Sequence, residues 1–152
     1  MKHSSKIIYY NDALTFGGHE EMMVRHIEMI QKEDVEQVVI CSSLNELLVN
    51  RIARLNIKII SLPLKRIPLQ TIFGFIHIPR ILKIYSIFKK EAPSVCIAVQ
   101  GNIVISMTGL LSSRIAGIPV ISYIPIAHIR KNSGVYSIIQ NVFHKILYLL
   151  PN

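Results

Sequence analysis

Five short apolar runs, separated by longer segments with helical character, constrain the fold of this chain more than any other feature. The runs are 6–10, 37–41, 57–60, 95–99 and 120–123, and Ile and Val dominate them. Runs of this length without polar alternation are typical of parallel strands that are buried on both faces. Their alternation with helical segments predicts an α/β fold, a doubly wound, Rossmann-like parallel sheet.

The segments between and after these runs have the spacing of amphipathic helices. Helices are expected over 19–32, 43–55, 78–90, 103–116 and 135–149. Ser43 and Glu46 form an S-x-x-E pattern, which predicts a capping box at the start of the second helix. Gly117 and Pro119 are expected to end the fourth helix.

The apolar composition does not require a membrane span. The chain has 152 residues, which fits one domain, and 51% of them are hydrophobic. Residues 92–113 carry no charge, but Gln100, Gly101 and Asn102 lie in the middle of that stretch. A strand, a turn and a helix explain it better than a span. Cys41 and Cys96 lie in apolar runs and the N-terminal run is too short for a signal peptide, so we expect a cytoplasmic protein.

Charge is strongly segregated along the chain. Residues 1–50 hold eight acids and four bases, whereas residues 51–152 hold thirteen bases and one acid, Glu91. The basic block predicts an anionic surface as partner, and a solvated basic face is the alternative interpretation. With no Trp and no basic patch interleaved with aromatic residues, a nucleic-acid partner is not expected. The candidate surface residues are Arg51, Arg54, Lys65, Arg66, Arg80, Lys83, Lys89 and Lys90.

Loops at the carboxyl ends of the strands are the expected place for a site, because ligands of open parallel sheets bind there. The loop after the first strand ends in Gly17, Gly18, His19 and Glu20 at a helix N-terminus, where free N–H groups can hold a phosphate. An ordinary glycine turn is the alternative, and Glu20 opposes an anion unless it points away. The sequence has no G-x-G-x-x-G and no Walker A pattern.

Two further loops carry polar residues at the same edge. Gln100, Gly101 and Asn102 follow the fourth strand, and His128 and Arg130 follow the fifth. His128 could donate to a hydroxyl or a phosphate and Arg130 could pair with an anion, whereas backbone bonding of a loop histidine is the alternative. No H-E-x-x-H or Cys/His cluster is present, so neither a metal nor another cofactor is expected.

The ordered set of these motifs resembles the N-terminal half of a GT-B fold glycosyltransferase of the large retaining family 4. Gly17-Gly18-His19-Glu20 is similar to that family's G-G-x-E motif, and Pro93-Ser94-Val95 is similar to its P-D-V motif. The segment 116–121 is similar to its A-G-I-P-V-V motif, and His128 lies where the family has a histidine. Ser94 replaces the family's Asp.

The resemblance implies the acceptor-side domain of a retaining glycosyltransferase. Gly17 and Gly18 would approach the phosphates of a nucleotide-sugar, His128 would contact the transferred sugar, and Gln100, Gly101, Asn102 and Arg130 would line the acceptor side. The acceptor would be a glycan or a lipid-linked sugar, at the inner face of the membrane.

Nothing in the sequence matches the family's donor-binding domain with its E-x7-E pair. The chain is therefore expected to be an N-terminal domain, incomplete at its C-terminus and inactive alone, with the donor domain supplied in cis or in trans. A split enzyme with two chains and a non-catalytic membrane-surface module are the alternatives.

Overall fold

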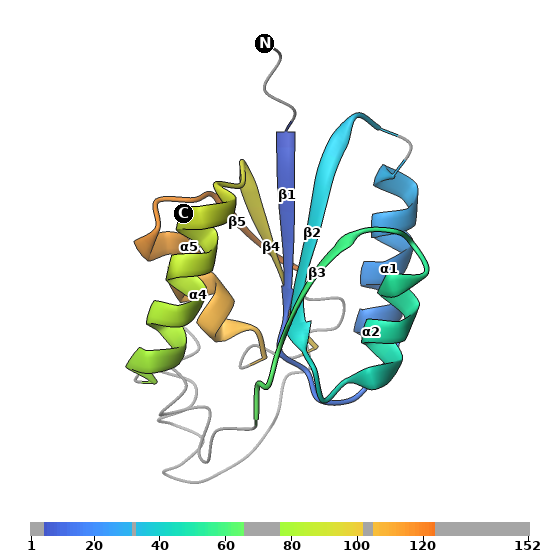
Figure 1. Cartoon of the computed structure of the whole chain (residues 1–152), viewed down its shortest axis with the longest axis horizontal. Coiled ribbons are helices and arrows are strands. Elements are labelled where there is room, and N and C mark those ends of the chain that lie inside the picture. The colour runs from blue at the N-terminus through green and yellow to red at the C-terminus, as the bar shows by residue number, and fades with distance from the viewer. Residues whose placement is uncertain (1–4, 32, 66–76, 102–104, 124–152) are drawn as a thin grey trace, which may run out of the picture.

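The computed structural model describes residues 5–31, 33–65, 77–101 and 105–123, and it contains a parallel β-sheet (Figure 1). The strands are β1 (Ser5–Asn11), β2 (Val35–Ser42), β3 (Lys58–Leu62), β4 (Val95–Val99) and β5 (Val120–Tyr123). Their order in the sheet is β3-β2-β1-β4-β5, and every neighbouring pair is parallel. The predicted parallel sheet is confirmed.

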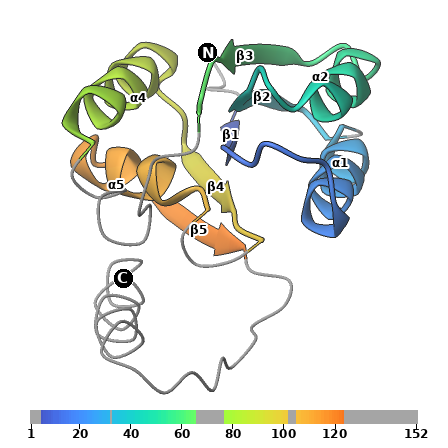
Figure 2. The same ribbon diagram turned by 90° about the horizontal axis from the view of Figure 1, so that it is seen from below.

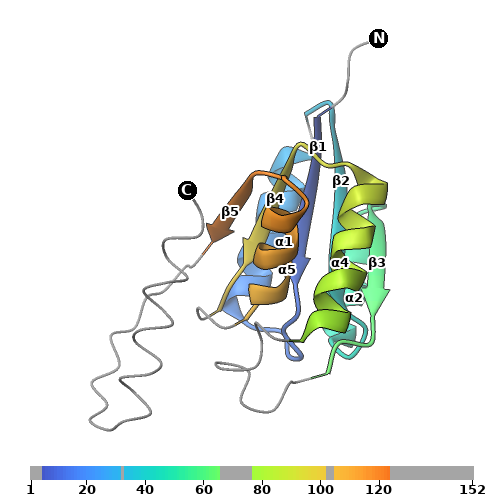
Figure 3. The ribbon, with the colours of Figure 1, turned by 90° about the vertical axis from the view of Figure 1, so that its left-hand side faces the viewer.

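Helices cover both faces of this sheet, as a doubly wound fold requires (Figures 2 and 3). One face carries α1 (Gly18–Ile30) and α2 (Glu46–Ala53), and the other carries α4 (Ile78–Glu91) and α5 (Met107–Ile115). The expected helix over 135–149 lies outside the described residues.

The two-sided cover explains the run of apolar residues in each strand. Ile8 and Tyr10 of β1 are fully buried in the core under α4 and α5, together with Phe88. Tyr9, between them, points to the other face and packs with Met23 of α1. Because successive side chains of a strand alternate between faces and both faces are covered, all positions at the centre of β1 are apolar or aromatic.

Two helix starts differ from the sequence prediction. The capping box at Ser43 was a wrong prediction, because the Ser43 N–H still bonds to Leu62 O beside β3. Helix α2 begins later, with Asn45 as N-cap, and the Asn45 side chain accepts a hydrogen bond from Leu48 N. Helix α5 begins at Met107 rather than near residue 103, because Ser106 is bonded to Val99 O and to Asp12 in a non-helical conformation.

The charge-free stretch 92–113 contains β4 and part of α5, as expected. Among the described residues no helix has the length and the apolar character needed to cross a membrane.

A cluster of charged side chains joins the amino ends of the strands. Glu91, at the end of α4, lies 2.7 Å from Lys58 Nζ of β3 and 3.5 Å from Lys6 Nζ of β1. Lys6 also lies 3.0 Å from Glu36 of β2. Glu91 is the only acid of residues 51–152, and its side chain is only 6% exposed. Glu91 therefore ties β1 and β3 to α4, and β2 joins the cluster through the Lys6–Glu36 pair.

Candidate functional site

The carboxyl ends of β1 and β4 form the switch point of the sheet, where open α/β sheets in general bind ligands. The chain runs outward from β1 through β2 to β3, and then returns to β4 on the other side of β1. The loops after β1 and β4 therefore diverge at this point, and such a switch point forms the ligand crevice of open α/β sheets. The sequence-predicted residues Gly17, Gly18, His19, Glu20, Gln100 and Gly101 all lie in these two loops or at their ends.

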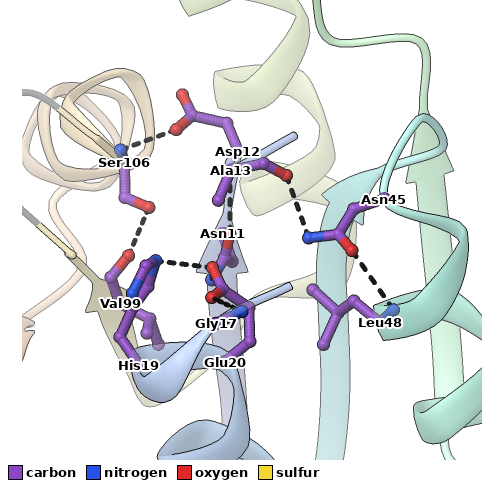
Figure 4. Close-up of polar contacts among 10 residues, drawn as sticks. All are labelled: Asn11, Asp12, Ala13, Gly17, His19, Glu20, Asn45, Leu48, Val99 and Ser106. Carbon is purple, nitrogen blue, oxygen red and sulfur yellow. Dashed lines mark hydrogen bonds and ion pairs between the residues drawn. The ribbon is translucent and has the colours of Figure 1, made fainter. Parts of the chain in front are cut away.

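Glu20 is turned back into the protein at the start of α1 (Figure 4). Its side chain is fully buried, and Oε2 accepts a hydrogen bond of 2.8 Å from Gly17 N at the N-cap. Oε1 accepts a hydrogen bond of 3.0 Å from Asn11 Nδ2, at the end of β1. A carboxylate at this place satisfies a free N–H group and interacts favourably with the helix dipole.

His19 lies at the switch point, between Glu20 and the loop after β4. Its Nε2 is 2.6 Å from Glu20 Oε1, and its side chain is 20% exposed. The ring packs on the backbone of Gly101, where an added Cβ would lie 2.3 Å from Cε1 of His19. The glycine after β4 therefore makes room for the imidazole.

The ionised form of Glu20 is stabilised in spite of its burial. Burial raises the pKa of this carboxyl, but the adjacent His19 ring and the hydrogen bond from Asn11 outweigh it and hold the pKa below its usual value. A buried carboxylate that stays ionised beside a histidine is a feature of sites that move protons.

Gly17 is the N-cap of α1, and Gly18 is the first residue of that helix. Gly17 is extended, with φ −152° and ψ −162°, and nothing lies within 4 Å of a Cβ added at Gly18. The N–H of Gly17 already donates a hydrogen bond to Glu20 and is therefore not available to a ligand. In the described part of the chain no partner is seen for the backbone N–H groups of Gly18 and His19, and these remain as donors for an anion.

Asp12 is a residue of the crevice that the sequence reasoning missed. It is 7% exposed, and its Oδ1 accepts a hydrogen bond of 2.7 Å from Ser106 N at the start of α5. Burial raises the pKa of Asp12, against the lowering effect of the Ser106 N–H and of Arg80. Asp12 is one of only two Asp residues in the chain and directly follows a strand, which is the signal that could have found it.

Ser106 holds a backbone conformation that is strained for a residue with a side chain. Its φ is 63° and its ψ is 10°, in the left-handed region that favours glycine. The side-chain Oγ donates a hydrogen bond of 2.6 Å to Val99 O, which fixes the loop after β4 onto its own strand. Strain of this kind persists where surrounding contacts determine the backbone, and it concentrates at functional sites.

Asn45 braces the loop after β1 from the opposite side (Figure 4). Its Nδ2 donates to Ala13 O at 3.2 Å while its Oδ1 caps α2. Gln100 has a similar role in the loop after β4, where its Nε2 donates to Ile105 O at 2.8 Å and its Oε1 contacts Ser122. Gln100 is only 1% exposed, so its side chain supports the crevice from behind.

The basic residues divide between the two faces of the sheet. Arg51 lies in α2 and Arg54 is the C-cap of that helix, and the Arg51 Nη2 is 2.8 Å from Glu21 Oε2. Helix α4 carries the other group, which consists of the half-buried Arg80 and the exposed Lys83, Lys89 and Lys90. Lys65 follows β3, and its carbonyl oxygen accepts a hydrogen bond of 2.6 Å from Arg80. Arg66, Asn102, His128 and Arg130 lie outside the described residues.

No family model matches this sequence, and no curated protein matches it. Solved structures match its fold. MurG of Acinetobacter baumannii is 14% identical, with a TM-score of 0.64 over 95% of this chain and 39% of the MurG chain. A UDP-N-acetylglucosamine 2-epimerase is 14% identical, with a TM-score of 0.66 over 97% of this chain and 40% of its own.

A Listeria monocytogenes protein assigned as a UDP-N-acetylglucosamine 2-epimerase is 16% identical, with a TM-score of 0.66 over 98% of this chain and 38% of its own. This chain therefore spans about two-fifths of the length of each of these proteins. They are GT-B fold proteins, and this chain has the Rossmann-like α/β fold of one GT-B domain. The expected N-terminal GT-B domain fits, whereas family 4 and the retaining chemistry stay predictions.

Proposed function

We propose that this chain is the acceptor-side domain of a glycosyltransferase that uses a nucleotide-sugar in polysaccharide or glycolipid synthesis. The observation that carries the proposal is the pair of His19 and a buried, ionised Glu20 at the switch point of a GT-B domain. An imidazole next to a carboxylate is suited to accept the proton of an acceptor hydroxyl. The N–H groups of Gly18 and His19 are suited to the developing charge of a leaving diphosphate.

The donor side of the reaction belongs to a second domain, in cis or in trans. The matched solved structures are more than twice as long as this chain, which supports this division. By resemblance, His128 contacts the transferred sugar, Arg130 and Asn102 extend the acceptor side, and no metal takes part.

The stereochemical outcome separates two versions of this function. Resemblance to family 4 implies retention of the anomeric configuration, whereas a base at the acceptor hydroxyl is what a direct, inverting displacement requires. The anomeric proton coupling in the NMR spectrum of the first product distinguishes the two.

Ligand mapping by NMR tests the proposal on the chain as it stands. UDP-N-acetylglucosamine, inorganic pyrophosphate and N-acetylglucosamine are added separately to labelled protein at millimolar concentration. We expect amide shifts at Gly17, Gly18, His19 and Gly101, and none at the amino ends of the strands. Shifts confined to other surfaces would contradict the proposed crevice. Release of nucleoside diphosphate, with and without an added donor domain, measures turnover.

A membrane-facing role for α4 is a second candidate, supported by its outer surface. Ile78 and Leu82, one turn apart, are 58% and 57% exposed, and exposed lysines follow at positions 83, 89 and 90. Apolar and cationic side chains on one helix surface favour an anionic leaflet. Ile81 and Ile84 take the buried positions of α4.

Flotation with vesicles tests this role. A Lys83→Gln, Lys89→Gln, Lys90→Gln variant is expected to lose binding to phosphatidylglycerol vesicles, whereas Arg54→Gln on the opposite face retains it. Equal binding of the wild type to neutral and anionic vesicles would refute the electrostatic argument. Binding with no sugar transfer in any assay would favour the non-catalytic module.

A further inference from the structure

Helix α5 is fastened to the end of β1 by two contacts one turn apart. The Ser106 N–H donates a hydrogen bond of 2.7 Å to Asp12 Oδ1, and both residues are buried (Figure 4). One turn later Gly109 lies against the ring of Tyr10, where an added Cβ would be 2.2 Å from Cδ1. The Tyr10 hydroxyl approaches the second oxygen of Asp12, Oδ2, at 3.5 Å. Asp12 therefore has a donor at each oxygen, and the shorter contact is the one with the start of α5.

The backbone of Ser106 is turned toward this carboxylate at a cost. An N-cap residue normally has an extended backbone, whereas the φ of Ser106 is 63°, which is unfavourable for a residue with a side chain. A hydrogen bond to an ionised acceptor is about twice as strong as one between neutral groups, and it offsets that cost. Asp12 therefore helps to hold the unusual conformation at the start of α5.

The loop after β4 is closed at its base by two side-chain hydrogen bonds. Ser106 Oγ donates to Val99 O, at the end of β4, at 2.6 Å (Figure 4). Inside that pair, Gln100 Nε2 donates to Ile105 O at 2.8 Å. Because the two ends of the loop are bonded to each other, a displacement of Ser106 is transmitted to Gln100 and to the residue that follows it.

That following residue, Gly101, lies against α1 across the switch point. A Cβ added at Gly101 would lie 2.3, 2.6 and 2.7 Å from Cε1, Nε2 and Nδ1 of His19. All three distances are far below van der Waals contact, so the ring is in close contact with the backbone after β4. The position of this backbone therefore limits the space that the imidazole has at the start of α1.

We propose that Asp12 is a positioning residue of the switch point, which through Ser106 holds the loop after β4 where Gly101 packs against the His19 ring. The ligand that the two loops would receive is that of the proposed function, on which this role rests. Asp12 is 7% exposed, so its effect passes through the loop rather than through contact with that ligand. An amide oxygen at position 12 could replace the carboxylate, because it also accepts a hydrogen bond.

NMR of the labelled full chain tests the bond in the wild type, without a variant. We expect a scalar coupling across the hydrogen bond between Ser106 N and the carboxyl carbon of Asp12. We also expect the Ser106 amide proton to be shifted downfield by the carboxylate. Either signal supports the bond, and a Ser106 amide with neither of them would overturn the proposal.

Two variants at position 12 separate positioning from stability. In Asp12→Ala the Ser106 N–H loses its acceptor, and we expect this amide to exchange about tenfold faster. The signals of the Gly101 amide and the His19 ring are expected to move as well. Asp12→Asn keeps an oxygen acceptor and is expected to leave both signals near their wild-type positions. Glu91→Gln, a destabilising change at the amino ends of the strands, is the matched control and should move neither.

Two results with these variants would overturn the proposal. One is an Asp12→Ala protein whose Gly101 and His19 signals are unmoved, and the other is an Asp12→Asn protein in which they move as far as in Asp12→Ala. If Asp12→Ala does not fold, Ser106→Gly provides a further test, because glycine accepts the φ of 63° and keeps the N–H but lacks the Oγ bond to Val99. The amide at position 106 should then keep its downfield shift while the Gly101 signal moves, and loss of that shift would contradict the role of Asp12.

Failure of the proposed function would be seen separately. UDP-N-acetylglucosamine, inorganic pyrophosphate and N-acetylglucosamine are added to the same labelled protein. Movement of the Gly101 and His19 signals in Asp12→Ala, with no response to any of these compounds, would support the positioning role and count against the proposed function. A response to one of them, with both signals unmoved in Asp12→Ala, would support the proposed function and overturn the positioning role.

Discussion

The contact between α5 and β1 makes Gly109→Ala the sharpest test of the packing behind the crevice. A Cβ at Gly109 would lie 2.2 Å from Cδ1 and 2.3 Å from Cγ of the Tyr10 ring. Tyr10 is fully buried, and its hydroxyl approaches Asp12 Oδ2 at 3.5 Å. The ring cannot move aside without disturbing either the sheet or Asp12.

The magnitude follows from two opposing effects. Replacing a helical glycine by alanine stabilises a helix by about 1 kcal/mol. Overpacking a core costs about 1–3 kcal/mol, and a contact more than 1 Å too short, against a ring in the central strand, belongs at the upper end. We expect the free energy of unfolding to fall by about 2 kcal/mol.

Urea unfolding followed by circular dichroism measures this difference. The midpoint is expected to fall while the slope with denaturant stays unchanged, because the folded state keeps its surface. Gly18→Ala is the matched control, since no atom lies within 4 Å of its added Cβ, and its effect is expected within about 0.5 kcal/mol. A Gly109→Ala protein as stable as the wild type, or more stable, would show that Tyr10 does not pack against α5 as described.

Three further predictions concern charge and burial. Glu91→Gln is expected to lower the free energy of unfolding by about 1–2 kcal/mol at pH 7. The expected loss is kept small because Lys58, the partner of Glu91, is 52% exposed and solvent weakens the ion pair. Hydrogen bonds from Lys58 hold the pKa of Glu91 below 4.5, so this difference should disappear as pH falls through that lowered pKa, which urea unfolding at pH 7 and pH 3 would check. Asp12→Asn is expected to raise the free energy of unfolding by about 0.5–1 kcal/mol at pH 7, because burial raises the pKa of Asp12 and its ionised form opposes folding. That gain should vanish below pH 3.8, where both states of the wild type bind the proton, and a loss of stability at pH 7 would contradict it. Burial raises the pKa of the Cys41 thiol to about 11 and that of Cys96 to about 12, so a thiol reagent should label both only after unfolding, and rapid labelling of the folded protein would refute their burial.

The sheet could be predicted from the sequence because the apolar runs are short, separate and nearly free of polar residues. The runs 95–99 and 120–123 coincide with β4 and β5, and the others differ from the observed strands by one or two residues at their ends. Burial on both faces makes such a strand apolar at every position, and the short length of each run distinguishes it from a buried helix.

The start of a helix depends on contacts that the sequence does not show. Ser43 has a better local pattern for an N-cap than Asn45, but the Ser43 N–H is already bonded to Leu62 across the sheet. Similarly, the bonds of Ser106 to Asp12 and Val99 delay the start of α5. In both helices, tertiary hydrogen bonds rather than the local sequence pattern determine the residue at which the helix begins.

The candidate site could be predicted in part. The motif at 17–20 identified the start of α1, and the rule for parallel sheets identified the loop after β4. The role of Gly101 depends on its distance from His19, 82 positions earlier in the chain, and the role of Asp12 depends on Ser106 in the same way. Contacts of this separation leave no trace in the local pattern of one sequence.

The basic block from Arg51 to Lys90 is continuous in sequence but not in space. Helices α2 and α4 lie on opposite faces of the sheet, so the block divides between them. Arg51 pairs with Glu21 of α1, which leaves α4 as the described surface where lysines and exposed apolar residues occur together.

The charged cluster around Glu91 lies at one end of β1 and the crevice at the other, about 20 Å away along the strand. Substitutions separated by more than about 10 Å, with no shared partner, add in free energy. The effects on the free energy of unfolding of a substitution at the crevice and of one at the charged cluster should therefore add. For laboratory evolution, a stronger cluster at the amino ends of the strands would give a more tolerant framework in which the crevice loops can be diversified toward new acceptors.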